Sequence, residues 1–157
     1  MEAMNSADDL SLDELKISTI SLTGDPAIVA SGIFAVQDEY KKLFRAGFWS
    51  SSFLGAVYTV EAQNRQRMKI AQKLGYDSYR LVLAASAENI YVISLDLKKL
   101  HHTIKRESIK VTVKKFGVSR HILIENLQTK ETFKFMGGTS PLSSVATGDK
   151  AVIEAIS

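Results

Sequence analysis

A run of short alternating segments at residues 79–135 constrains the fold of this chain more than any other feature. Apolar and polar residues alternate there over several consecutive segments, a period of two that fits strands with one buried face and does not fit helices. Consecutive strands joined by short turns form antiparallel meanders. The sequence therefore predicts an α+β protein with a small curved antiparallel β-sheet or partly open barrel, preceded by one or two helices.

The segments within this run give the order of the expected strands. Residues 79–85 and 90–95 are expected to form a β-hairpin whose four-residue loop is 86–89. A connector at residues 96–102 leads to strands at 108–114, 121–127 and 131–135. We expect five apolar side chains to point inward: Ile109, Val111, Val113, Phe133 and Phe135. The intervening residues, Lys110, Thr112, Lys114 and Lys134, are expected to face water.

The first half of the chain predicts a different organisation. Residues 1–15 read as a flexible acidic lead, and residues 16–157 as a single domain with a helical part at about 26–75 and a meander at about 79–136. Residues 16–22 alternate like a strand. The Asp25-Pro26 pair is typical of a helix start, and an imperfect helical period follows to about residue 46, although residues 29–34 also fit a strand.

Two further helices are expected around this framework. Residues 50–74 carry an apolar stripe at three- and four-residue steps, and Gly75 is placed to end that helix. The second half of this helix is basic. A short C-terminal helix at residues 148–156 is expected to close one end of the barrel.

The composition of the chain indicates the cellular compartment in which we expect the protein. The chain has no cysteine, which fits a reducing environment, and its first residues lack the basic and apolar regions of a secretory signal. The apolar stretch at residues 46–60 is shorter than the roughly 20 residues that a spanning helix needs. We therefore expect a cytoplasmic protein, with association at the membrane periphery as the alternative.

Charge is distributed unevenly along the chain. Residues 1–39 hold eight acidic residues and one lysine, whereas residues 96–134 hold ten Lys and Arg and four acidic residues. The acidic segment could lie over the basic strands and screen them, or the basic strands could attract an anionic partner or simply be hydrated. The candidates for binding an anion or a lipid headgroup are Lys98, Lys99, Lys105, Arg106, Lys110, Lys114, Lys115 and Arg120.

Residue patterns for catalysis, metal binding and nucleic-acid binding are weak. Zinc could in principle be bound by His101, His102 and His121 with Asp96 or Glu107, but the spacing is no metal signature, and neighbours on a strand point to opposite faces. No serine lies in a nucleophile elbow, and Gly137-Gly138 lacks the lysine of a phosphate-binding loop. Only Phe116 lies among the cations as an aromatic that could stack on bases. We expect no enzyme, no metal, no cofactor and no nucleic-acid partner.

The order of hairpin, connector and paired strands resembles a known family. The segments RLVLAASAENIYVISL, IKRESIKVTV and HILIENLQTKETFKF, preceded by the apolar GFWSSSFLGAVYTV, are similar to pleckstrin-homology-like (PH-like) domains in small bacterial proteins. The resemblance covers about residues 47–135 and implies a curved sheet with a C-terminal helix. Lipid-binding members carry cations at the first hairpin loop, whereas residues 86–89 here offer Glu88 and no cation.

The function predicted from these patterns is interaction without catalysis. We expect a module that binds another protein or itself through exposed strand edges and an aromatic cluster. That cluster consists of Phe48, Trp49, Phe53 and Leu54. The alternative is peripheral binding to an anionic membrane surface through the basic strands and the apolar helix.

Overall fold

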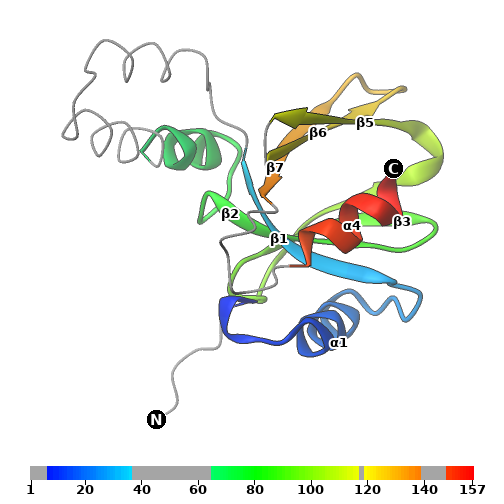
Figure 1. Cartoon of the computed structure of the whole chain (residues 1–157). Coiled ribbons are helices and arrows are strands. Elements are labelled where there is room, and N and C mark those ends of the chain that lie inside the picture. The colour runs from blue at the N-terminus through cyan, green and yellow to red at the C-terminus, as the bar shows by residue number, and fades with distance from the viewer. Residues whose placement is uncertain (1–6, 37–64, 117–118, 139–147) are drawn as a thin grey trace.

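The computed structural model describes residues 7–36, 65–116, 119–138 and 148–157 (Figure 1). Two helical elements, η1 (Ala7–Asp9) and α1 (Leu12–Thr23), precede the first strand. The strands are β1 (Ala30–Val36), β2 (Arg80–Ala85), β3 (Asn89–Ser94), β4 (Leu100–Lys105), β5 (Ile109–Phe116), β6 (Ser119–Asn126) and β7 (Thr132–Gly138). The short η2 (Arg106–Ser108) joins β4 to β5, and α4 (Asp149–Ile156) follows β7. Residues 65–73 are also helical.

The strands of the described residues form one open antiparallel sheet in the order β4-β3-β2-β1-β7-β6-β5. This confirms the predicted α+β class with a curved sheet that is not closed. The prediction of one continuous meander is wrong, because β1 lies between two meanders of three strands each. It pairs with β2 from Ala30↔Ala85 to Ala35↔Arg80 and with β7 at Ala35↔Met136 and Val36↔Phe135. Strands β4 and β5, although close in sequence, are therefore the two opposite edges of the sheet.

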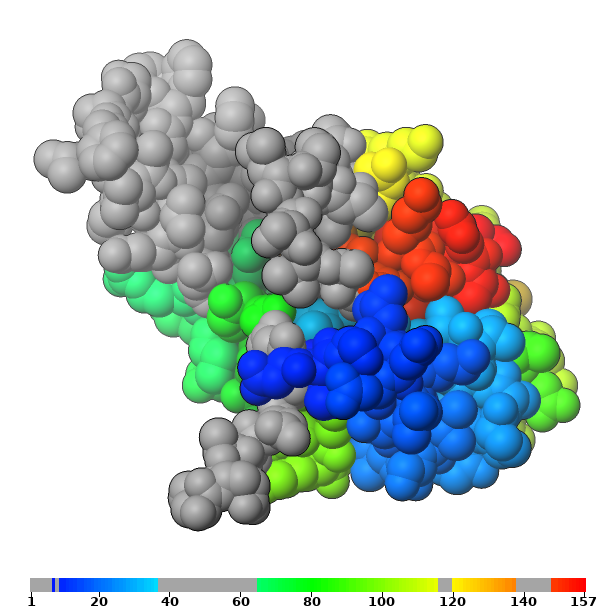
Figure 2. Space-filling view, turned by 60° about the horizontal axis from the view of Figure 1, so that its bottom comes forward, coloured from blue at the N-terminus to red at the C-terminus, as the bar shows by residue number. Residues whose placement is uncertain are grey.

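Helices cover both faces of the sheet around β1. In Figure 1, α1 lies on one side of β1 and α4 on the other, and the β5-β6-β7 strands arch over α4. Leu15 of α1 packs with Val82 and Ile93, whereas Val152 and Ile156 of α4 join the core on the inner face. The two helices border each other at the surface seen in Figure 2, where Leu12 approaches Gly148.

Helix α1 replaces the strand predicted at residues 16–22. Ser11 is its N-cap, and a capping box joins Ser11 and Glu14: the Glu14 N–H donates to Ser11 Oγ and the Ser11 N–H to Glu14 Oε1. Leu15 and Thr19 are buried at helical spacing, and the helix ends at Gly24 with φ +74°. Ala7 and Leu15, which belong to the segment predicted as an acidic lead, are buried in the structure. Residues 1–6 lie outside the described residues.

Strand β1 occupies a stretch that was predicted to be helical. Both of its faces are covered, so its residues are almost all buried and show no alternation by which a strand could be recognised. Gly32 gives room for the close approach of α4, since a Cβ there would lie 2.5 Å from the Gly148 carbonyl carbon. The alternative assignment of residues 29–34 to a strand is the one that the structure bears out.

Several other expectations are confirmed. The β2–β3 hairpin closes through the loop at 86–89, where the Ser86 N–H donates to the Asn89 carbonyl at 2.9 Å. The helix at 65–73 ends at Gly75, whose φ is +86°, and the Tyr76 N–H donates to the Ala71 carbonyl. The C-terminal helix is present as α4. The predicted helix at 50–64 lies outside the described residues.

Two boundaries of the strand series differ from the prediction. Strand β4 begins at Leu100, so the expected connector at 96–102 is shorter, and β7 continues through Gly137 to Gly138. Gly137 is buried because Phe34 packs over it, with only 2.9 Å between a Cβ at this position and Phe34 Cε2. The strand thus includes the Gly-Gly pair, which was expected to follow it, and ends at Gly138.

Candidate interaction surface

The first candidate for a binding surface is the edge strand β5. It is eight residues long, and β6 is its strand neighbour in the sheet that the described residues form. A long edge strand presents unpaired backbone N–H and C=O groups, which can pair with another extended chain.

The hydrogen bonds at the end of the β5–β6 pair show which backbone groups point to this edge. The Leu127 N–H donates to the Ser108 carbonyl at 2.8 Å, so this pair is hydrogen bonded and the bonded pairs alternate along the ladder from it. Lys110, Thr112 and Lys114 therefore bond to β6. In the described part of the sheet, the residues whose N–H and C=O groups both face the free edge are Val111, Val113 and Lys115. The Ile109 N–H is already used, because it donates to the Arg106 carbonyl.

The side chains of β5 separate into an apolar inner face and a basic outer face, as predicted. Ile109, Val111 and Val113 pack against the inner core but remain partly accessible. On the outer face Lys110 and Lys114 are exposed. Their neighbours on β6 are Glu125, opposite Lys110, and His121, opposite Lys114. The outer face of β5 therefore carries a net positive charge, with the Glu125 carboxylate beside Lys110.

The eight basic candidates do not form one site. Lys98 and Lys99 lie in the β3–β4 turn, Lys105 and Arg106 at the start of η2, and the other four on β5 and β6. Arg106 has a structural role, because its Nη1 donates to the Ser86 carbonyl at 2.9 Å and its Nη2 to the Ala155 carbonyl at 3.1 Å. It ties α4 to the hairpin loop, which the sequence did not indicate.

Helix α1 lies away from β5 in the described part of the chain. It packs on β1, and Leu15 joins residues of β2 and β3. Its first-turn acids, Asp13 and Glu14, are thus on the other half of the sheet from Lys110 and Lys114. Within residues 7–36, nothing supports the interpretation that the acidic segment screens the basic strands.

The side chains of His101 and His102 were predicted to point to opposite faces of a strand, but the structure places both rings against one tyrosine. The β3–β4 register shifts between Val92 and Ile93, from Val92↔His102 to Ile93↔Leu100, so His101 is the additional residue of a bulge. Both rings contact Tyr76, with centroid distances of 4.9 Å for His101 and 5.8 Å for His102. His102 also meets Phe133 of β7 edge to face, at 5.0 Å. The bulge has no signal in the sequence.

Burial sets the protonation of this aromatic cluster. Desolvation lowers the pKa of His102 below its usual value, against a smaller opposing effect of Glu131. It also lowers the pKa of His101, with a further contribution from the nearby Lys99 charge. Burial raises the pKa of Tyr76 to about 12. At neutral pH the cluster is therefore uncharged, as its packing against Phe133 requires.

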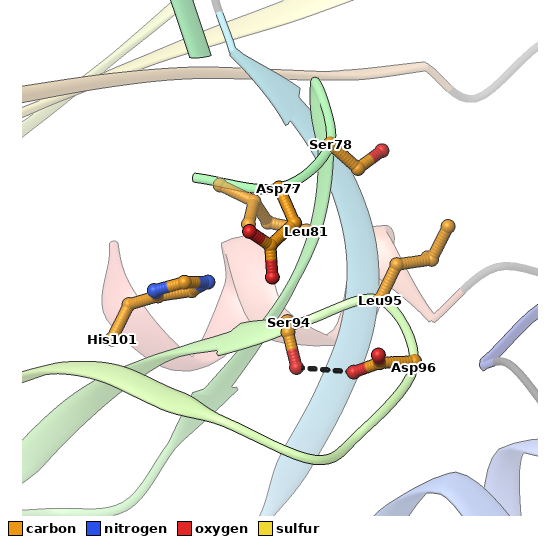
Figure 3. A pocket seen from close by; sticks show the side chains of 7 residues that line it. All are labelled: Asp77, Ser78, Leu81, Ser94, Leu95, Asp96 and His101. Carbon is orange, nitrogen blue, oxygen red and sulfur yellow. Dashed lines mark hydrogen bonds between the residues drawn. The ribbon is translucent and has the colours of Figure 1, made fainter. Parts of the chain in front are cut away.

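A small pocket lies beside His101, at the turn between β3 and β4 (Figure 3). It has a volume of about 260 Å³, and Asp77, Ser94 and Asp96 lie around it with His101. Ser94 Oγ donates to Asp96 Oδ1 at 2.6 Å and accepts from the Lys99 N–H at 2.9 Å. The Ser94 hydrogen bond is the main cause of the lowered pKa of Asp96. These polar groups hold the turn, and the space is smaller than most ligand pockets.

Several candidate sites find no support in the described residues or lie outside them. Across the described ranges no group of three His, Asp or Glu side chains is arranged to hold a metal ion. Within the same ranges, the helices are too short or too polar to cross a membrane. The predicted interface cluster, Phe48, Trp49, Phe53 and Leu54, lies outside the described residues.

Comparisons with known proteins give no family for this chain. No protein-family model matches it, and no curated protein matches it. The function must therefore be inferred from the residues and their arrangement.

Proposed function

We propose that this chain is a non-catalytic interaction module with a PH-like fold, and that it binds another protein along the free edge of β5. The observation that carries the proposal is the combination, on one eight-residue strand, of outward backbone groups, accessible apolar side chains and exposed lysines. Addition of a strand to such an edge supplies affinity through main-chain hydrogen bonds and specificity through alternate side chains.

Charge opposes one register in which a second copy of this chain could pair at the edge. Antiparallel pairing of two β5 strands centred on Thr112 aligns their edge-facing residues, Val111 with Val113. The same register places Lys110 of each copy opposite Lys114 of the other. Like charges directly opposite each other destabilise a strand pair. Self-association through β5 in this register is therefore disfavoured, whereas registers centred on Val111 or Val113 place a lysine opposite Thr112 and are not opposed by charge.

Panning of random displayed peptides tests the edge directly. Wild-type protein is the bait, and Val113→Pro and Val111→Pro are the counter-baits, since proline removes an edge N–H without removing a bond to β6. Two variants are used so that one can serve if the other fails to fold, as judged by circular dichroism. Peptides that bind wild type and not the folded proline variant support the proposal. Enrichment of peptides that bind both equally, or no enrichment, contradicts it.

Peripheral binding to an anionic membrane is the second candidate. It is favoured by the three exposed lysines on the outer face of β5 and β7, Lys110, Lys114 and Lys134, which surround Leu123. Sedimentation with phosphatidylserine and neutral vesicles at low and high salt separates the two candidates. Retention on anionic vesicles alone, lost with salt and with Lys110→Glu/Lys114→Glu, would favour the membrane over a protein partner.

A further inference from the structure

We infer that the β5 edge selects an extended acidic segment with a defined pattern: acidic, apolar, any residue, apolar, acidic. The inference rests on the proposed function and specifies the partner. It follows from three properties of β5: the direction of its backbone groups, the accessibility of its inner side chains and the spacing of its outer lysines.

The apolar positions of the pattern follow from the inner face. A strand that pairs with β5 exchanges its backbone hydrogen bonds with Val111 and Val113, which point their N–H and C=O groups to the edge. Partner residues directly opposite these two valines point to the same face of the sheet as the valines. That face is the inner one, where Val111 and Val113 are only partly buried. Apolar partner side chains would complete their burial.

The acidic positions follow from the outer face. Lys110 and Lys114 are exposed, lie four residues apart and point outward, so the partner residues opposite them also point outward. Opposite charges on directly opposed strand residues stabilise the pair. Glu125 lies on the β6 side of Lys110, whereas the partner approaches from the other side. The central position, opposite Thr112, carries no charge requirement.

The pattern reads the same from either end. A docked strand of either direction therefore meets both lysines with an acidic residue and both valines with an apolar one. Lys115 has edge-facing backbone groups and an exposed side chain beyond Lys114, so a third acidic residue after the pattern is compatible with the surface.

Two synthetic peptides test the inference on the full chain. One is Thr-Glu-Val-Thr-Val-Glu-Thr, and the other replaces both glutamates by lysine. Binding is measured by fluorescence anisotropy and by backbone amide shifts in NMR spectra. We expect the acidic peptide to bind and to shift the amides of Val111, Val113 and Lys115 most. Exchange of two attractive charge pairs for repulsive ones should weaken binding on the order of tenfold for the lysine peptide.

Charge reversal supplies the matched controls. Lys110→Glu/Lys114→Glu should weaken the acidic peptide on the order of tenfold and strengthen the lysine peptide. Lys69→Glu/Lys73→Glu makes the same change in net charge at two exposed helical positions and should alter binding by no more than about twofold, through long-range charge alone. Equal losses in both variants, or amide shifts that avoid β5, overturn the inference.

Failure of the inference can be told apart from failure of the proposed function. If panning yields peptides that need the β5 edge but lack acidic residues, the edge binds protein and the acidic pattern is wrong. If neither synthetic peptide binds at millimolar concentration and panning yields no edge-dependent peptide, both are wrong.

Discussion

Strands β1–β3 and strands β5–β7 belong to one sheet, but other parts of the protein cover them to different extents. Strands β1, β2 and β3 are buried on both faces, under α1 on one side and α4 on the other. Strands β5, β6 and β7 bury their inner face, whereas their outer face carries exposed lysines. The first half supplies most of the core, and the second half keeps accessible backbone and charge. Most of the core and the proposed binding surface thus lie on different strands of one sheet.

The contact between α4 and β1 should give the largest effect in the doubly covered half. Gly32→Val places a side chain against the Gly148 backbone, where a Cβ alone would lie 2.5 Å from the carbonyl carbon. Neither backbone can yield without moving α4, so we expect a loss of about 4 kcal/mol or of the folded state. Urea unfolding measures it. Thr112→Val on β5 is the control, and equal stability of the two variants would remove the distinction between the halves.

A matched pair of leucines compares the halves directly. Leu83 is fully buried on β2, whereas Leu123 lies on the outer face of β6 and is only partly buried. Leu83→Ala should cost about 3 kcal/mol through lost burial and a residual cavity. Leu123→Ala should cost less than about 1 kcal/mol. If chemical denaturation gives similar costs, the outer face of β5-β6-β7 is covered in solution.

The histidine cluster predicts a pH dependence that links the halves, because His102 of β4 contacts Phe133 of β7. Burial lowers the pKa of His102 and of His101 in the folded state, so the unfolded state binds more protons as pH falls. The free energy of unfolding should be highest above pH 6.5, which is about the histidine pKa in the unfolded state, and should decline as the pH falls below that value. Thermal unfolding at several pH values measures this decline.

His102→Phe tests the origin of that decline, since phenylalanine keeps an aromatic ring against Tyr76 and Phe133 and cannot be protonated. We expect a shallower loss of stability below pH 6.5 in this variant. A profile as steep as that of the unaltered protein would contradict the assignment of the decline to His102.

The smallest effect on stability should come from the outer lysines. Lys110→Glu/Lys114→Glu changes two exposed side chains of the edge strand, and we expect the free energy of unfolding to change by less than about 0.5 kcal/mol. A larger loss in urea unfolding would mean that these lysines stabilise the fold, and that their effect on binding could not be read separately.

Sequence patterns predicted the singly covered half better than the doubly covered one. Alternation marks a strand only when one face is wet, so the inward Phe135 and the outward Lys134 of β7 could be assigned from the pattern. Strand β1 has no solvent-facing side, so its residues fitted a helix and a strand and the pattern left both open. Residues 16–22 alternate like a strand in the sequence but form part of α1, which begins with the Ser11–Glu14 capping box and buries Leu15 and Thr19.

The two faces of β5 were predicted from the sequence, whereas the position of β5 at an edge of the sheet was not. The lysines of β5 and their outward direction follow from alternation, and exposed strand edges were expected to bind. Which strand is an edge depends on pairing between residues far apart in the chain, such as Val36 with Phe135. Other long-range contacts are also absent from the local pattern: Arg106 donates to the Ala155 carbonyl, and the rings of His101 and His102 both contact Tyr76.

The sequence by itself determined the α+β class, the β2–β3 hairpin, the glycine that ends the helix at 65–73 and the two faces of β5. These depend on neighbours a few residues apart, where local propensity and periodicity act. Only the tertiary structure decided that β1 separates the two meanders and that β5 is an edge. Strand order depends on which surfaces bury each other most completely, and that balance involves the whole chain at once.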